Sequence, residues 1–169
     1  MLELGVPITL TAHGRSMYPT YTSPQKLIVQ NKEYDLGDTV LAYSETLLYR
    51  VHRIVKKEPI GLRLKGDGSI VLDECLSHNN ILGVVVGVYY HGMRLMYNRN
   101  TFFYFLSRHI SRISLLRCKT PYVQIQTHVL KRILYAILNR ILDIALYSMK
   151  HILILLCTRR ADKGVGIAS

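Results

Sequence analysis

Short runs of apolar residues alternate with turn-forming residues over the first ninety positions of the chain. The runs are four to ten residues long and rich in Val, Ile, Leu and Tyr, and clusters of Gly, Pro, Asp and Asn separate them. This spacing is typical of strands joined by turns. The predicted strands cover residues 8–11, 26–30, 38–43, 47–56, 61–65 and 81–90. We therefore expect a compact, mostly antiparallel β-fold here.

The period of the pattern changes after residue 98. Over residues 102–117, Ser and Arg recur every three or four positions, opposite an apolar set of Phe, Leu and Ile. Over residues 128–158, polar positions recur at the same steps and Leu, Ile and Ala occupy the other faces. Both patterns predict helices. The sequence thus predicts a β domain over residues 1–98 and a basic, amphipathic helical region over 99–169, an α+β chain overall.

Positive charge is concentrated in the predicted helical region. Residues 1–90 contain nine Lys/Arg and nine Asp/Glu, whereas residues 91–169 contain thirteen Lys/Arg and two Asp/Glu. Such asymmetry indicates an anionic partner rather than a particular fold. No zinc-finger, homeodomain or RNP-type pattern is present to bind nucleic acid. We therefore expect an anionic membrane surface as the partner of the basic helices, and no nucleic acid.

The longer predicted helix leaves three placements open. It could lie in a membrane interface, pack against the β domain or a second copy, or span a bilayer. In a span, Arg140 and Asp143 would lie near the middle, where each costs roughly 2.5–3.5 kcal/mol. A basic face beside a broad Leu/Ile face is typical of an interfacial helix.

Cysteine and histidine spacing predicts neither a disulfide framework nor a metal site. The three cysteines, Cys75, Cys118 and Cys157, are odd in number and form no CxxC pair, and the seven histidines form no HExxH pattern. We expect no metal and no cofactor. Residues 1–12 contain an acidic Glu3 and no basic segment, so the sequence predicts no N-terminal signal or anchor and a cytoplasmic or membrane-associated protein.

Two short motifs could supply nucleophilic chemistry. Ser16 lies in a predicted tight turn between Gly14 and Pro19, where the backbone N–H groups around Gly14 and Arg15 could form an oxyanion hole. His52 lies on a predicted strand in a Val-His-Arg run, and histidine suits the role of general base. Taken singly, each also fits an ordinary turn serine or strand histidine.

The order and spacing of five motifs over residues 8–90 resemble the signal-peptidase and LexA-repressor superfamily of serine peptidases. The motifs are residues 14–19, 37–40, 51–54, 65–67 and 82–87. Relatives that use a lysine as base form one branch. The endoplasmic-reticulum, archaeal and sporulation-type signal peptidases have histidine in a Val-His-Arg context, and His52 places this chain with that branch.

The resemblance implies a LexA/signal-peptidase-like β-fold and a serine endopeptidase that cleaves leader or signal-type peptides from peptide or preprotein substrates. It implies Asp73 as the third catalytic residue, with Glu74 as the alternative carboxylate. Asp67 is interpreted as an organiser of its turn, with a catalytic role as the alternative, and Lys65 is given no catalytic role.

Two departures from the family pattern qualify these expectations. Gly14 stands where signal peptidases have a serine that can donate to the oxyanion, and Gly68 and Ser69 follow Asp67 where relatives commonly have two asparagines. The alternative interpretation is a non-catalytic or self-cleaving peptidase-like module, regulatory or binding, whose helical tail binds a membrane or a partner.

Overall fold

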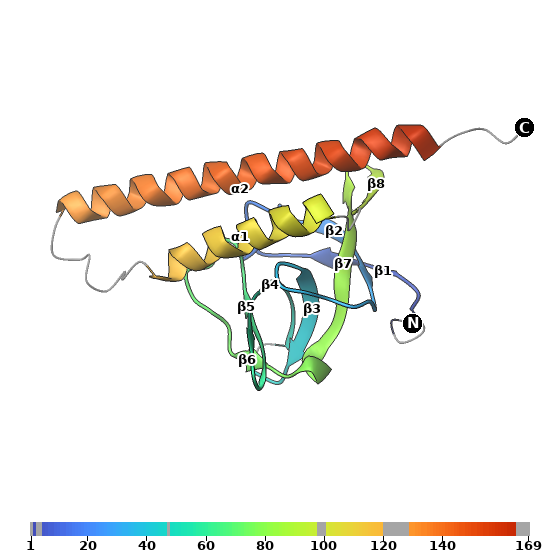
Figure 1. Cartoon of the computed structure of the whole chain (residues 1–169), viewed down its shortest axis with the longest axis horizontal. Helices are drawn as coiled ribbons and strands as arrows, with labels where there is room; N and C mark the ends of the chain where they lie inside the picture. Colours follow the sequence, from blue (N-terminus) through green and yellow to red (C-terminus); the bar gives the residue numbers. More distant parts are fainter. Residues whose placement is uncertain (1, 3–4, 47, 98–100, 120–128, 165–169) are drawn as a thin grey trace, which may run out of the picture.

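The computed structural model describes residues 2, 5–46, 48–97, 101–119 and 129–164. Its centre is one eight-stranded antiparallel sheet with the order β1-β2-β7-β3-β4-β5-β6, and β8 pairs with β7 off this path (Figure 1). The strands are β1 (Ile8–Ala12), β2 (Gln25–Gln30), β3 (Thr39–Ser44), β4 (Leu48–Glu58), β5 (Gly61–Lys65), β6 (Cys75–Leu76), β7 (Ile81–Tyr90) and β8 (Met93–Met96). Two helices follow, α1 (Thr101–Lys119) and α2 (Val129–Gly164).

The predicted fold class, a β-rich first part followed by helices, is confirmed. All six predicted strands occur to within two residues at each end, but β6 and β8 were not predicted. The helix predicted over residues 102–117 is α1, and α2 continues six residues past the predicted end at 158. Residue 128 and the domain boundary predicted between residues 98 and 99 lie outside the described part of the chain.

Two clusters of buried aliphatic side chains hold the sheet together. One gathers Leu27 and Val29 of β2 with Val85 of β7, and it extends to Met17 beside the Ser16 turn. The other joins β3, β4, β5, β6 and β7 through a separate set: Val40, Ala42, Ile54, Leu62, Leu64, Leu76 and Val84. The strands that position the candidate site are therefore fixed by a close-packed interior.

Helix α1 packs on the β domain through serine side chains. Ser107, Ser111 and Ser114 are at most 1 % exposed, and the Ser111 hydroxyl donates to the Ile54 carbonyl at 3.3 Å. The helix comes so close to Gly37 that a Cβ added there would lie 2.8 Å from the Ser107 carbonyl carbon. The serines belong to the polar stripe that the sequence pattern sets opposite the apolar positions, yet they face the protein.

Helix α2 forms the outermost layer, and α1 lies between it and the sheet (Figure 1). It contacts α1 and β8, and Leu142 and Leu146 are buried. Of the three predicted placements of this helix, the structure therefore has the one in which it packs against the β domain. Within the described residues no helix combines the length and the apolar character needed to cross a membrane.

Candidate active site

Ser16 lies in a turn that follows β1 directly. Gly14 has a φ of +96°, a backbone conformation that favours glycine, and its N–H donates to Ser23 Oγ at 3.1 Å. The Arg15 carbonyl accepts from the Tyr18 N–H at 3.0 Å and closes the turn. Both Arg15 and Ser16 are exposed, so the Ser16 hydroxyl is accessible from solvent.

The loop that follows β5 contacts the backbone of the Ser16 turn and stabilises it. The Gly68 N–H donates to the Ser16 carbonyl at 2.7 Å. A Cβ added to Gly66 would lie 2.5 Å from the same carbonyl oxygen, and one added to Gly68 would lie 2.7 Å from the Tyr18 carbonyl oxygen. Glycine is needed at both positions because the two backbones approach within contact distance.

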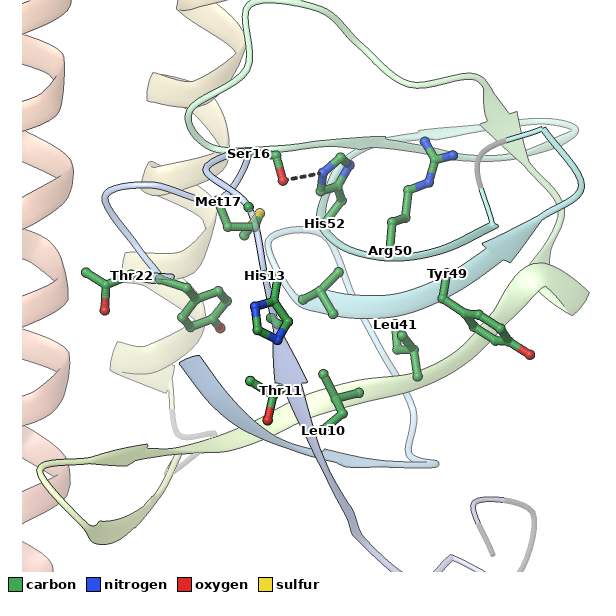
Figure 2. A pocket seen from close by; sticks show the side chains of 14 residues that line it. Leu10, Thr11, His13, Ser16, Met17, Thr22, Leu41, Tyr49, Arg50 and His52 are labelled. Carbon is green, nitrogen blue, oxygen red and sulfur yellow. Dashed lines mark hydrogen bonds between the residues drawn. The ribbon is translucent and has the colours of Figure 1, made fainter. Parts of the chain in front are cut away.

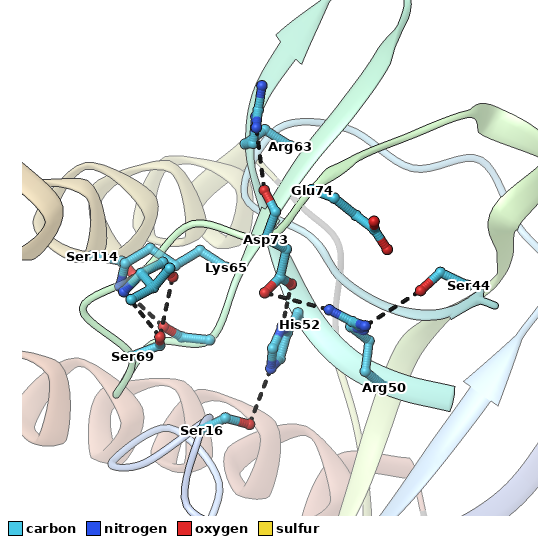
Figure 3. A network of polar contacts seen from close by, with 12 residues as sticks. Ser16, Ser44, Arg50, His52, Arg63, Lys65, Ser69, Asp73, Glu74 and Ser114 are labelled. Atoms are coloured by element: carbon cyan, nitrogen blue, oxygen red, sulfur yellow. Dashed lines mark hydrogen bonds and ion pairs between the residues drawn. The ribbon is translucent and has the colours of Figure 1, made fainter. Parts of the chain in front are cut away.

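His52 comes from the middle of β4, where it pairs with Val40 of β3. Its Nε2 lies 3.0 Å from Ser16 Oγ (Figure 3), which is hydrogen-bond distance for a nucleophile and its base. Its side chain is 12 % exposed. The two residues are 36 positions apart in the chain, and the fold brings the Ser16 turn against strand β4.

Asp73 contacts the other side of the His52 ring. One carboxylate oxygen forms a hydrogen bond with His52 Nδ1, and the other lies 3.5 Å from the Arg50 guanidinium. The backbone is fixed as well, since the Asp73 N–H donates to the Leu64 carbonyl at 3.1 Å and Arg63 donates to the Asp73 carbonyl at 3.3 Å. Ser16, His52 and Asp73 thus form one continuous chain of hydrogen bonds (Figure 3).

The surroundings of Asp73 favour its ionised form. Burial alone would raise the pKa of this carboxyl group, but the hydrogen bond with His52, the charge of that ring and the nearby Arg50 together hold the pKa below its usual value. An ionised Asp73 can fix the proton of His52 on Nδ1. Nε2 is then left as the acceptor that faces the Ser16 hydroxyl.

Glu74, the alternative carboxylate, is engaged elsewhere. Its Oε1 accepts a hydrogen bond from the Thr46 hydroxyl at 2.7 Å. Hydrogen bonds from Thr46 and Ser44 lower the pKa of Glu74. The structure therefore brings Asp73, and not Glu74, to His52.

Asp67 is fully buried and joins the Ser16 turn to the sheet. Its two oxygens accept from Arg53 at 2.9 and 2.6 Å, and the Thr20 hydroxyl donates to one of them at 2.6 Å. Arg53 also donates to the Gly37 carbonyl at 2.7 Å. These contacts are those of a turn organiser, the role that the sequence analysis favours for Asp67.

Sequence reasoning missed two polar side chains next to this site. Arg50 lies two positions before His52 on the same strand, so the period of two places both side chains on one face. That signal was available in the sequence. Ser114 of α1 accepts a hydrogen bond from the buried Lys65 ammonium at 2.8 Å, and no local sequence signal links positions 49 residues apart.

A cavity of about 560 Å³ opens beside Ser16 and His52. Figure 2 shows these two residues at one end of it and Leu10 and Thr11 at the other. The walls come from the end of β1, from the start of β4 and from Met17, Tyr21 and Leu41. The lining is mostly apolar, and Ser16 is one of the residues that line the cavity.

No group of three or more His, Cys, Asp and Glu side chains within the described residues is arranged to hold a metal ion. What the site presents is therefore a hydroxyl, an imidazole and a carboxylate in sequence, beside an apolar cavity.

Comparisons with protein-family models, with curated proteins and with solved structures found no match for this chain.

Proposed function

We propose that this protein is a serine endopeptidase, similar to signal peptidases, that cleaves leader or signal-type peptides. The observation that carries the proposal is the chain from Ser16 Oγ to His52 Nε2 at 3.0 Å and from His52 Nδ1 to Asp73. The resemblance of the five sequence motifs supports the same conclusion independently of the geometry.

In the proposed mechanism, Ser16 Oγ attacks the scissile carbonyl while His52 Nε2 takes the hydroxyl proton. Asp73 holds the ring and stabilises the imidazolium that forms. The proton then passes from His52 to the leaving amine, and water, activated by His52 in turn, hydrolyses the acyl-enzyme. Within the described residues, neither the Arg15 N–H nor the Ser16 N–H donates to a backbone carbonyl, so both are our candidate donors to the oxyanion. The Gly14 N–H is already bound to Ser23.

The cavity supports an extended peptide as the substrate. Within the described residues β1 pairs on one side only, with β2, and residues 10–12 of this strand line the cavity. An extended peptide can add to such an edge through backbone hydrogen bonds and place alternate side chains in pockets. The apolar lining favours apolar side chains, and the resemblance to signal peptidases implies small residues before the cleavage point.

The test is labelling with a serine-reactive fluorophosphonate. Purified wild-type protein should form a covalent adduct at Ser16, whereas Ser16→Ala and His52→Ala should not. Ser77→Ala removes another exposed serine, whose hydroxyl donates to Asn80 and not to His52, and should label like the wild type. A wild-type protein that neither labels nor cleaves any member of an extended-peptide library would refute the proposal and favour the non-catalytic module.

A further inference from the structure

The outer face of α2 carries a stripe of exposed apolar side chains. Its members are 43 to 65 % exposed, and at 3.6 residues per turn they fall within about 80° of one another around the helix. They are Ile137, Ile141, Ile144, Ile152 and Leu155. We call this set the outer stripe. The opposite side of the helix holds the buried Leu142 and Leu146 that pack on the protein.

The outer stripe is not a continuation of the core. Figure 1 shows α2 as the outermost layer, with α1 and the sheet on one side of it only. Five large aliphatic side chains are exposed on one face of the helix, where the exposed Ser148 separates Ile144 from Ile152, and such apolar surfaces mark sites of interaction. The helix is 36 residues long, about 54 Å, so the surface is long and narrow.

The charge of α2 identifies the kind of partner. The helix contains seven Lys/Arg and two Asp, and Arg140 is exposed beside the stripe while no acidic residue is exposed on the part of α2 whose side chains are described. An apolar stripe with an exposed arginine beside it, on a helix whose sequence carries a net positive charge, matches the acyl chains and phosphates of an anionic lipid surface.

A second copy of the chain fits this surface less well. A two-fold symmetric contact through the outer stripes would bring two α2 helices together. Each has an excess of five basic over acidic residues, so two helices of the same net charge would approach one another and repel. Anionic lipid, by contrast, pairs with the same charges.

We propose that the outer stripe of α2 docks this protein in the plane of an anionic membrane surface. The inference goes beyond the proposed peptidase activity and does not depend on it. The assay therefore uses the full chain with Ser16→Ala, which lacks the proposed nucleophile. Sedimentation with vesicles of phosphatidylcholine, with and without about 30 % phosphatidylglycerol, measures the affinity.

The protein should bind the anionic vesicles more tightly than the neutral ones, and added salt should weaken the binding. Ile141→Ser with Ile144→Ser should reduce the affinity on the order of a hundredfold, about tenfold for each buried aliphatic side chain lost. Ile60→Ser is the matched control. Ile60 is 80 % exposed between β4 and β5, whose hairpin lies away from α2 (Figure 1), so this change should leave binding unaltered.

Three results would overturn the proposal, provided circular dichroism shows that the variants are folded. The first is no binding to either vesicle type. The second is that the protein binds neutral and anionic vesicles with equal affinity, or that the double variant binds anionic vesicles as tightly as its parent. The third is a dimer in sedimentation velocity that the double variant dissociates while vesicles bind neither protein, which would assign the stripe to a second copy.

Discussion

Replacing Asp73 with asparagine tests the proposed mechanism most directly, because the structure dictates how the new amide must lie. One oxygen of Asp73 faces the Arg50 guanidinium, which can only donate hydrogen bonds. In the Asp73→Asn variant the amide oxygen would therefore face Arg50, and the NH₂ group would face His52 Nδ1. Nδ1 must then accept, so the neutral ring carries its proton on Nε2 and cannot take the proton of Ser16.

The expected loss follows from this change of tautomer. In serine peptidases the wrong tautomer costs roughly 10⁴ in kcat, so we expect a fall of about 10³–10⁴ in kcat/KM, equivalent to roughly 4–5.5 kcal/mol of transition-state stabilisation. The rate of fluorophosphonate labelling measures the same step when no peptide substrate is known. It should fall in proportion while the unfolding midpoint changes little.

Glu74→Gln is the matched control for this experiment. Glu74 binds the Thr46 hydroxyl rather than His52, so the labelling rate should change by no more than about twofold, as for an ordinary surface substitution. The reasoning fails if Asp73→Asn labels as fast as the wild type, or if the large loss belongs to Glu74→Gln instead.

Three further predictions concern the support of the site. Asp67→Ala leaves the Arg53 guanidinium, 3 % exposed, without its carboxylate and should lower the free energy of unfolding in urea by about 3–5 kcal/mol; a smaller loss than about 1 kcal/mol would contradict this. Gly66→Ala places a Cβ 2.5 Å from the Ser16 carbonyl oxygen, so labelling should slow on the order of a hundredfold, and an unchanged rate would show that the turn yields freely. Because the pKa of Asp73 is lowered, its stabilisation is complete above its ordinary value near about 3.9 and is lost as the pH falls through the lowered value. The melting temperature of the wild type should therefore fall more steeply below about pH 4 than that of Asp73→Asn, and parallel curves would be the contrary result.

The sequence pattern predicted most of the fold because the long strands show a clear period. β6 has only two residues, too few to show any alternation. The His91-Gly92 turn before β8, with φ angles of 47° and 81°, is typical of a tight hairpin. The four residues that follow were nonetheless not predicted as a strand; in the structure they pair with β7, and Leu95 is buried in the core.

The buried serines of α1 show why hydropathy misassigned a helix face. Serine counts as polar, so the pattern favours a solvated position for it. Here the small side chain allows the helix to approach the Gly37 backbone, and the Ile54 carbonyl accepts the Ser111 hydroxyl proton. Both conditions depend on residues more than fifty positions away, which no local pattern reveals.

At the candidate site, the residue types were predictable but the choice between neighbouring carboxylates was not. Asp73 and Glu74 are adjacent, and an extra loop residue would exchange their roles. The structure distinguishes them through the Asp73 N–H bond to Leu64, which holds this residue against β5, and through Thr46, which takes up Glu74. These contacts are long-range and are therefore absent from the motif.

The sequence divides into a β domain and a helical region, but the proposed catalytic unit includes parts of both. The loop that supports the Ser16 turn begins at Lys65, which is fully buried and donates to the Gly66 carbonyl at 3.0 Å and to Ser114 of α1 at 2.8 Å. A buried ammonium is costly unless it is hydrogen-bonded, so the β domain without α1 would lose an acceptor that stabilises this loop. Helix α1 is thus a structural part of the proposed catalytic unit, although it contributes no catalytic residue. Helix α2 packs on that unit through one face, and its outer stripe, the proposed membrane contact, lies on the other face.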